Sequence, residues 1–309
     1  MAKNLLVTHI DLDGISPIIL LNLTGIDFEY KTIEISEVLD TFNELIENGL
    51  ENYENVYITD LTIPDEIYKK FNEKNLTNIK VFDHHETHLY ANQYNYATVK
   101  VKINDIPTCG TELFYLYLKD IYPEINTKSV NEYVKYVREL DTFLFTSDLP
   151  KDLDLLKDTY GNLNFIKSIT KRLKRNSEEF KFTAFEKRFT KIKKEELTRY
   201  LQKKDKKMLR AHIDGKYCGI SFAETNKSEL GNYLSVKYPE LDLIILIDAS
   251  SRISYRTARE DIRVNDFAST YGGGGHVKAS GSDFNDDNRK KIIEEYYKDV
   301  KWEETTQSE

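Results

Sequence analysis

Histidine and aspartate residues gather in three short blocks of this sequence. The blocks are HIDLDG at residues 9–14, ITDLT at 58–62 and FDHHETH at 82–88. They hold four of the six histidines in the chain, and imidazole and carboxylate groups together are typical ligands of divalent metals. Burying several carboxylates at one place is costly unless a positive charge offsets them. On its own, HIDLDG is equally typical of a polar turn.

The elements around these blocks predict that they lie together. Each block follows or completes an apolar run typical of a strand: LLVTHI at 5–10, NVYITD at 55–60 and IKVFD at 79–83. Helical patterns at about 37–48 and 64–75 separate the runs. Strands that alternate with helices indicate a parallel sheet, and open α/β sheets bind ligands at the carboxyl ends of their strands. We therefore expect the blocks to meet at one edge of the sheet.

Two further segments carry groups that suit phosphate chemistry. EYVKYVRELDTFLF has helical spacing, with Asp141 near its end. YGGGGHVKASG at 271–281 has four glycines before His276, which indicates backbone amides that approach an anion closely. In ISYRTA, Arg256 suits bidentate contact with a phosphate.

In their order and separation, HIDLDG, TDLT, DHH and ELDTF resemble motifs I to IV of the DHH phosphoesterase superfamily. GGGGHVKASG resembles the signature of the DHH-associated C-terminal domain, and Ser254 with Arg256 resembles that domain's Ser-x-Arg strand. HIDLDG, together with CGTELFYLYL at 109–118 and the following RELDTFLF, most resembles the bacterial and phage branch of nanoRNA-degrading oligoribonucleases and cyclic-nucleotide phosphodiesterases.

The resemblance implies roles for particular residues. One metal would be held by His9, Asp11 and Asp60, and a second by Asp13, Asp60, His84 and Asp141. Asp60 would bridge the two ions, His85 would contact the scissile phosphate or leaving oxygen, and Asp83 would orient a histidine. Substrate binding would fall to Ser254, Arg256, Gly273, Gly274, Gly275 and His276. Ligands without a thiolate favour Mn²⁺, with Mg²⁺ or Co²⁺ as alternatives.

At 309 residues the chain is long enough for two domains. We expect an α/β protein with an N-terminal DHH catalytic domain, residues 1–150, built on a mostly parallel sheet. A helical connector at 151–205 and a smaller mixed α/β substrate-binding domain at 206–302 would follow. The second domain would begin with a hairpin about Asp214-Gly215. The active site would lie in the cleft between the two domains.

Charge and composition narrow the classes of protein. The net charge is −8, but residues 167–210 hold 17 Lys or Arg and 6 Asp or Glu, a local charge of +11. This basic segment is either a solvated helical linker or a surface that attracts a phosphate backbone. No apolar run approaches the roughly 18 residues of a membrane span, and no signal peptide is visible. We expect a cytoplasmic protein without a membrane partner, in which Cys109 and Cys218 are free buried thiols.

The combined pattern predicts a two-metal phosphodiesterase that hydrolyses short oligonucleotides, such as nanoRNA and dinucleotides, to mononucleotides. A phosphodiesterase of cyclic mono- or dinucleotides is the alternative, since the same metals would serve it. A non-enzymatic nucleotide-binding protein fits poorly with an intact ligand set. A manganese pyrophosphatase would lack the GGGGH element. The choice between RNA and DNA stays open, as does the oligomeric state, with a homodimer among the options.

Overall fold

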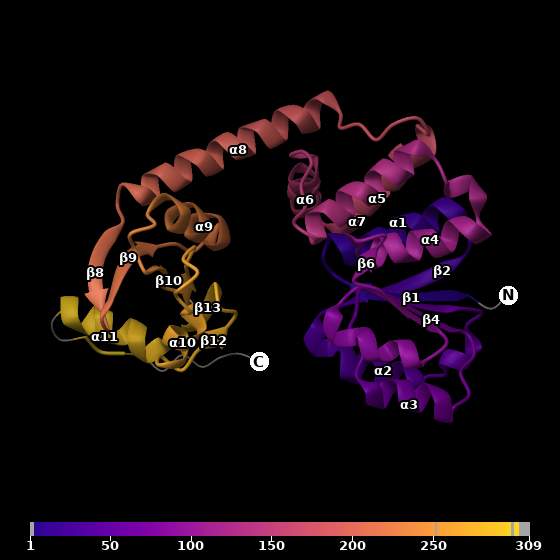
Figure 1. Ribbon diagram of the computed structural model, residues 1–309, viewed down its shortest axis with the longest axis horizontal. Helices are drawn as coiled ribbons and strands as arrows, with labels where there is room; N and C mark the ends of the chain where they lie inside the picture. Colours follow the sequence, from indigo (N-terminus) through magenta and orange to yellow (C-terminus); the bar gives the residue numbers. More distant parts are fainter. Residues whose placement is uncertain (1–2, 251, 298–299, 303–309) are drawn as a thin grey trace. The chain divides into compact units, whose positions relative to one another are not determined.

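The computed structural model describes residues 3–250, 252–297 and 300–302 (Figure 1). The chain divides into two compact units, Met1–Thr190 and Lys191–Glu309. Within the described ranges, no helix has both the length and the apolar character needed to cross a membrane.

A five-stranded sheet forms the centre of the first unit, in the order β2-β1-β3-β4-β5. Its strands are β1 (Asn4–His9), β2 (Phe28–Ile33), β3 (Val56–Thr59), β4 (Ile79–Asp83) and β5 (Ala97–Val99). Every pairing in this sheet is parallel, which confirms the predicted parallel architecture. A two-stranded antiparallel ribbon of β6 (Lys102–Ile103) and β7 (Ile106–Pro107) follows it.

Helices cover both faces of this sheet because its strands carry apolar side chains on both sides. In β1, Leu5 and Val7 belong to one core, whereas Leu6 belongs to the other. Figure 1 shows α2 and α3 on one face and α1, α4, α5 and α7 on the other. The helices are α1 (Leu12–Thr24), α2 (Val38–Glu47), α3 (Asp65–Glu73), α4 (Gly110–Ile121), α5 (Lys128–Asp141), α6 (Leu149–Tyr160) and α7 (Asn162–Arg175).

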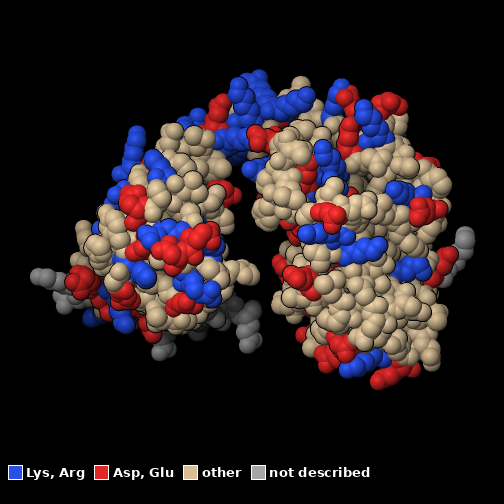
Figure 2. All heavy atoms as spheres, viewed as in Figure 1, with Lys and Arg blue, Asp and Glu red and all other residues tan. Residues whose placement is uncertain are grey.

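Part of the segment predicted as a connector contributes to the first core. Leu153 of α6 and Phe165 and Ile169 of α7 are buried in the cluster that also contains Leu6. The next helix, α8 (Ala184–Asp205), is rich in lysine and arginine, which gather along it in Figure 2. The division into three domains stays a prediction. Helices α6 and α7, which it assigns to the connector, pack their apolar faces against the core of the first unit.

The second unit contains a six-stranded mixed sheet in the order β12-β13-β11-β10-β9-β8. Its strands are β8 (Leu209–Ile213), β9 (Lys216–Phe222), β10 (Leu243–Asp248), β11 (Arg252–Arg256), β12 (Gly274–Gly275) and β13 (Ala279–Asp283). Its further helices are α9 (Lys227–Lys237), α10 (Val264–Ser269) and α11 (Asp286–Tyr296). The predicted hairpin is confirmed, since Asp214 and Gly215 both take positive φ, 49° and 74°, between β8 and β9.

The strand order fixes where a ligand site can form in the first unit. From β1 the chain runs to β2 on one side and then to β3 on the other, so the direction of winding reverses between β1 and β3. Loops diverge at such a point and leave a crevice at the carboxyl ends of the two strands. His9 is the last residue of β1, and Asp60 directly follows β3.

Candidate metal centre

His9 and Asp11 begin the site at the end of β1. Asp11 is the N-cap of α1, where its side chain accepts a hydrogen bond of 2.8 Å from the Gly14 amide. His9 Nδ1 lies 3.1 Å from Asp11 Oδ2 and 3.6 Å from Asp60 Oδ2. The neighbouring carboxylates of Asp11 and Asp60 raise the pKa of His9 to about 10. The imidazole therefore sits in a strongly negative environment.

Asp60 lies at the centre of the cluster and is only 2% exposed. Its φ of +54° is left-handed, a conformation that costs energy in a residue other than glycine and recurs at functional sites. Its Oδ2 atom is buried without a hydrogen-bond partner among the described residues. Burial, followed by the negative charge of Asp13, raises the pKa of Asp60 well above its ordinary value. This carboxylate is thus placed where a cation would stabilise it.

Asp13 is buried in the first turn of α1 and is held by the beginning of α4. Its carboxylate accepts hydrogen bonds of 2.7 Å from the Gly110 amide and 2.9 Å from the Thr111 amide. A helix N-terminus favours negative charge, so the start of α4 suits the Asp13 carboxylate as a hydrogen-bond partner. A Cβ atom on Gly110 would lie 3.0 Å from Asp60 Cβ and 3.1 Å from Asp13 Oδ2. Cys109, the N-cap residue of α4, is fully buried, and burial raises the pKa of its thiol.

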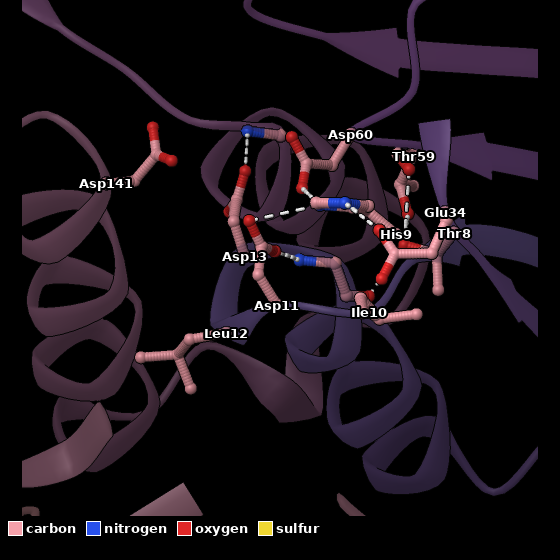
Figure 3. A network of polar contacts seen from close by, with 12 residues as sticks. Thr8, His9, Ile10, Asp11, Leu12, Asp13, Glu34, Thr59, Asp60 and Asp141 are labelled. Atoms are coloured by element: carbon pink, nitrogen blue, oxygen red, sulfur yellow. Dashed lines mark hydrogen bonds and ion pairs between the residues drawn. The ribbon is translucent and has the colours of Figure 1, made fainter. Parts of the chain in front are cut away.

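His84 and Asp141 complete the cluster from the loop after β4 and the end of α5. His84 Nε2 lies 3.4 Å from Asp60 Oδ1 and 3.4 Å from Asp141 Oδ2. Both His84 Nε2 and Asp141 Oδ2 are buried and lack a hydrogen-bond partner in the described part of the chain. Burial and the charge of Asp13 raise the pKa of Asp141 to about 7. Figure 3 shows Asp141 on its helix, and its ligand atom lies within 4.8 Å of those of Asp13 and His84.

A second layer of contacts fixes Asp83 and His85. Asp83, fully buried at the end of β4, accepts from His85 Nδ1 at 2.8 Å and from His88 Nδ1 at 2.6 Å. Burial alone would raise the pKa of Asp83, but these two bonds outweigh it and hold the pKa well below its usual range. His88 Nε2 accepts a 3.2 Å bond from the Ile63 amide, which leaves the proton on Nδ1.

His88 is therefore a supporting residue. The sequence places it with the other strand-end histidines, but the structure buries it completely, with its Nε2 also 3.0 Å from the Tyr68 hydroxyl. The sequence also did not predict the hydrogen bonds that the Gly110 and Thr111 amides donate to Asp13. The only sequence signal for them was the position of CGTELFYLYL at the start of a helical pattern.

The side chains present fit divalent cations. Their ligand atoms form three groups, within each of which all atoms lie within 4.8 Å of one another: His9, Asp11 and Asp60; Asp13, His84 and Asp141; and Asp60, Asp83, His84 and His85. Two ligands about 2.1 Å from an ion and at right angles to each other are about 3 Å apart, close to the separations here. Converging carboxylates and buried atoms without partners are what a cation would satisfy.

The predicted substrate-binding residues all lie in the second unit. Arg256, in β11, donates from Nη1 to the carbonyls of Tyr255 at 2.9 Å and Ser280 at 3.3 Å, and burial lowers its pKa. The Gly273 amide donates to the Ala268 carbonyl at 2.9 Å. Of the other predicted substrate-binding residues, Ser254 is buried in β11, Gly274 and Gly275 form β12, and His276 is exposed. Their roles in substrate binding stay a prediction.

Comparison with known proteins gives one close relative and many similar folds. The chain is 31% identical over 302 residues to oligoribonuclease NrnB of Bacillus subtilis (strain 168), which covers 95% of this chain and 76% of that protein. The structure of the pGpG-specific phosphodiesterase PggH from Vibrio cholerae is similar, with a TM-score of 0.56 and 15% identity. That match covers 95% of this chain and 97% of the other. No protein-family model matches the chain.

Gly110 provides a test of this geometry. In Gly110→Ala the new methyl group would press on Asp60 and Asp13, so we expect Mn²⁺ affinity to fall about 10- to 100-fold, as for other residues that support metal ligands. Isothermal titration calorimetry would measure it. Gly25→Ala is the matched control, because Gly25 has a φ of +77° and open space around it. Gly25→Ala should reduce stability without changing metal affinity. If Gly110→Ala also left metal affinity unchanged, the proposed crowding of Asp60 and Asp13 would be wrong.

The pKa shifts predict how stability depends on pH in the metal-free protein. With a pKa near 7, against 3.8 for an ordinary Asp, Asp141 binds its proton more tightly in the folded state. Its contribution to the free energy of unfolding is therefore lost as the pH rises from about 3.8 to about 7. His9, raised from 6.5 to about 10, loses its contribution in the same direction at higher pH.

A divalent cation bound at this cluster would replace these protons, so the increase in Tm on adding Mn²⁺ should grow between about pH 5.5 and pH 8. Differential scanning fluorimetry of chelator-treated protein would measure this increase. In Asp141→Asn the slope below about pH 7 should flatten, because the titrating carboxylate is gone. A metal effect that is constant across the range would contradict the assignment of these shifts to the cluster.

Proposed function

The chain belongs to the DHH superfamily of phosphoesterases, and from that premise we propose that it hydrolyses short oligonucleotides to mononucleotides. The observation that carries the proposal is the convergence of imidazole and carboxylate groups where β1 and β3 end. Such a cluster suits metal-assisted cleavage of a phosphodiester. The oligoribonuclease name of the Bacillus subtilis relative supports oligonucleotides as the substrate class.

The proposed centre holds two divalent ions. His9, Asp11 and Asp60 would hold one, and Asp13, Asp60, His84 and Asp141 the other, with Asp60 shared. Mn²⁺ suits this mixture of carboxylate and imidazole ligands, and Mg²⁺ and Co²⁺ are the alternatives. Bound ions of this kind supply a hydroxide nucleophile near neutral pH and screen the charge that develops on the phosphate.

His85 is our candidate for contact with the scissile phosphate or leaving oxygen. Its side chain is 43% exposed, and its Nδ1 is fixed by the 2.8 Å bond to Asp83. This bond raises the pKa of His85, so the imidazole holds a proton more readily than an ordinary histidine, and Nε2 is the ring nitrogen that Asp83 does not bind. We assign His85 Nε2 to donate a proton or hydrogen bond to the scissile phosphate or leaving oxygen. Asp83, in turn held by His88, sets the orientation of the ring.

The second unit supplies the proposed substrate contacts. Ser254, Arg256, Gly273, Gly274, Gly275 and His276 would hold the terminal phosphate or base of the substrate. The exposed His276 side chain is available for this role. Arg256 would have to exchange its bonds to the Tyr255 and Ser280 carbonyls for a phosphate.

A substrate panel tests the function. We expect purified protein with Mn²⁺ to convert dinucleotides to mononucleotides and to act weakly on cyclic mono- and dinucleotides, as followed by chromatography of the products. Asp60→Asn keeps a residue that tolerates the positive φ but removes the charge shared by both ligand groups. It should lower kcat at least about 1,000-fold, the scale on which a lost electrostatic contact at the reacting centre acts. Preference for a cyclic dinucleotide would establish the alternative phosphodiesterase activity instead.

Dependence on substrate length and salt gives an independent measurement. A site that holds the substrate by a few short-range contacts should cleave dinucleotides to about pentanucleotides fastest, with a shallow salt dependence. The basic surface of α8 would act on longer strands, and its attraction should weaken steeply as salt rises. Initial rates on a dinucleotide and on a strand of about 20 nucleotides, each across a salt series, separate the two cases. Efficient and strongly salt-sensitive digestion of the long strand would contradict a preference for short substrates.

A further inference from the structure

Large aromatic and aliphatic side chains stand at the surface directly after Asp141. Phe143 is 79% exposed and Leu144 is 51% exposed. The rings of Phe143 and Phe145 meet edge to face, with centroids 6.2 Å apart. Because only one residue separates Phe143 from Asp141, their Cα atoms lie within about 7.6 Å of each other. The backbone that carries this exposed ring therefore lies close to Asp141, a proposed metal ligand.

The loop that carries these side chains, residues 142–146, is shaped by polar contacts. At its start, the Thr142 hydroxyl donates to the Arg138 carbonyl at 2.7 Å. At its end, Thr146 donates to the carboxylate of Glu139 from its amide at 3.2 Å and from its hydroxyl at 2.7 Å. Glu139 is itself buried. The loop thus has a defined shape that does not depend on burying Phe143.

The backbone at Phe143 gives a second reason to look for a role. Its φ is +56°, a left-handed conformation that bulky residues rarely adopt. Glycine or asparagine would relieve this strain. The ring is mostly exposed, so it buries little apolar surface that could offset the unfavourable backbone. Strain that is retained in this way is typical of positions that contact a ligand.

The charge next to the rings matches a nucleotide. Lys151 Nζ lies 4.4 Å from the ring centroid of Phe145, which places a cation against the aromatic pair. A nucleotide offers a flat base with a negatively charged phosphate on either side of its sugar. Proteins that bind single strands combine aromatic faces for the bases with positive charge for the backbone.

We propose that Phe143, supported by Phe145, stacks on a nucleobase next to the phosphate that is cleaved. This inference rests on the proposed oligonucleotide substrate and names the residue that holds its base. The ring would fix the base, the metal centre would act on the adjoining phosphate, and Lys151 would attract the charge beside the stacked base.

Steady-state kinetics with dinucleotides test the proposal. Phe143→Ala keeps a Cβ atom and so leaves the backbone strain unchanged, whereas it removes the ring. We expect KM to rise about 10-fold or more, as for the loss of one aromatic–base stack, while kcat changes much less. Phe143→Tyr should retain a KM near that of the wild type. Phe185→Ala is the matched control, because Phe185 is 68% exposed on α8 and stacks on Phe189.

Dinucleotides that lack one base distinguish stacking from other contacts. Removing the stacked base should raise KM for the wild-type protein and leave no further effect for Phe143→Ala, since the two changes remove one interaction. An equal effect of Phe143→Ala on intact and abasic dinucleotides would overturn the proposal and assign the ring to a contact with other protein surface. An unchanged KM for intact dinucleotides would overturn it as well.

A binding measurement separates this proposal from the proposed activity. Asp60→Asn protein mixed with a dinucleotide containing 2-aminopurine should quench its fluorescence, because stacking on an aromatic ring quenches this base. The double variant Asp60→Asn/Phe143→Ala should not. Quenching without hydrolysis by the wild type would contradict the activity and support the stacking. Hydrolysis by the wild type, with equal quenching by Asp60→Asn and by the double variant, would support the activity and contradict the stacking.

Discussion

Negative charge held out of water is the constraint on which the first unit depends. Asp13, Asp60 and Asp83 are all almost fully buried, and Asp141 is close enough to feel the charge of Asp13. A different kind of partner stabilises each of these buried carboxylates. The amides at the start of α4 hold Asp13, two histidines hold Asp83, and Asp60 and Asp141 keep buried oxygens for which cations are the natural partners. The parallel sheet matters because it brings these side chains to one edge.

The strand ends could be predicted because they depend on local pattern. Apolar runs that stop at His9, Asp60 and Asp83 define both the strands and the polar edge, so parallel topology follows from the helices between them. The helical spacing before Asp141 likewise predicts its place at the end of α5. The glycine run after α10 is a different case. Its position was clear from sequence, but the use of the Gly273 amide to cap the helix depends on the neighbouring backbone.

Contacts between distant segments could not be predicted. Gly110 donates to Asp13 across 97 positions, and no pattern in either segment encodes that pairing. The role of His88 depends on Ile63 and Tyr68, which reach it only once α3 has packed on the sheet. The periodicity of α6 and α7 predicts helices but not which core receives them. Each of these features is set by tertiary packing, where single-sequence patterns carry little information.

The buried thiol at the start of α4 has a consequence for oxidation. Thiolates, rather than thiols, react with peroxides. Cys109 has no exposed surface and adjoins the amides that hold Asp13, and its raised pKa keeps it in the unreactive thiol form. The helix start that holds Asp13 is therefore also protected from oxidation.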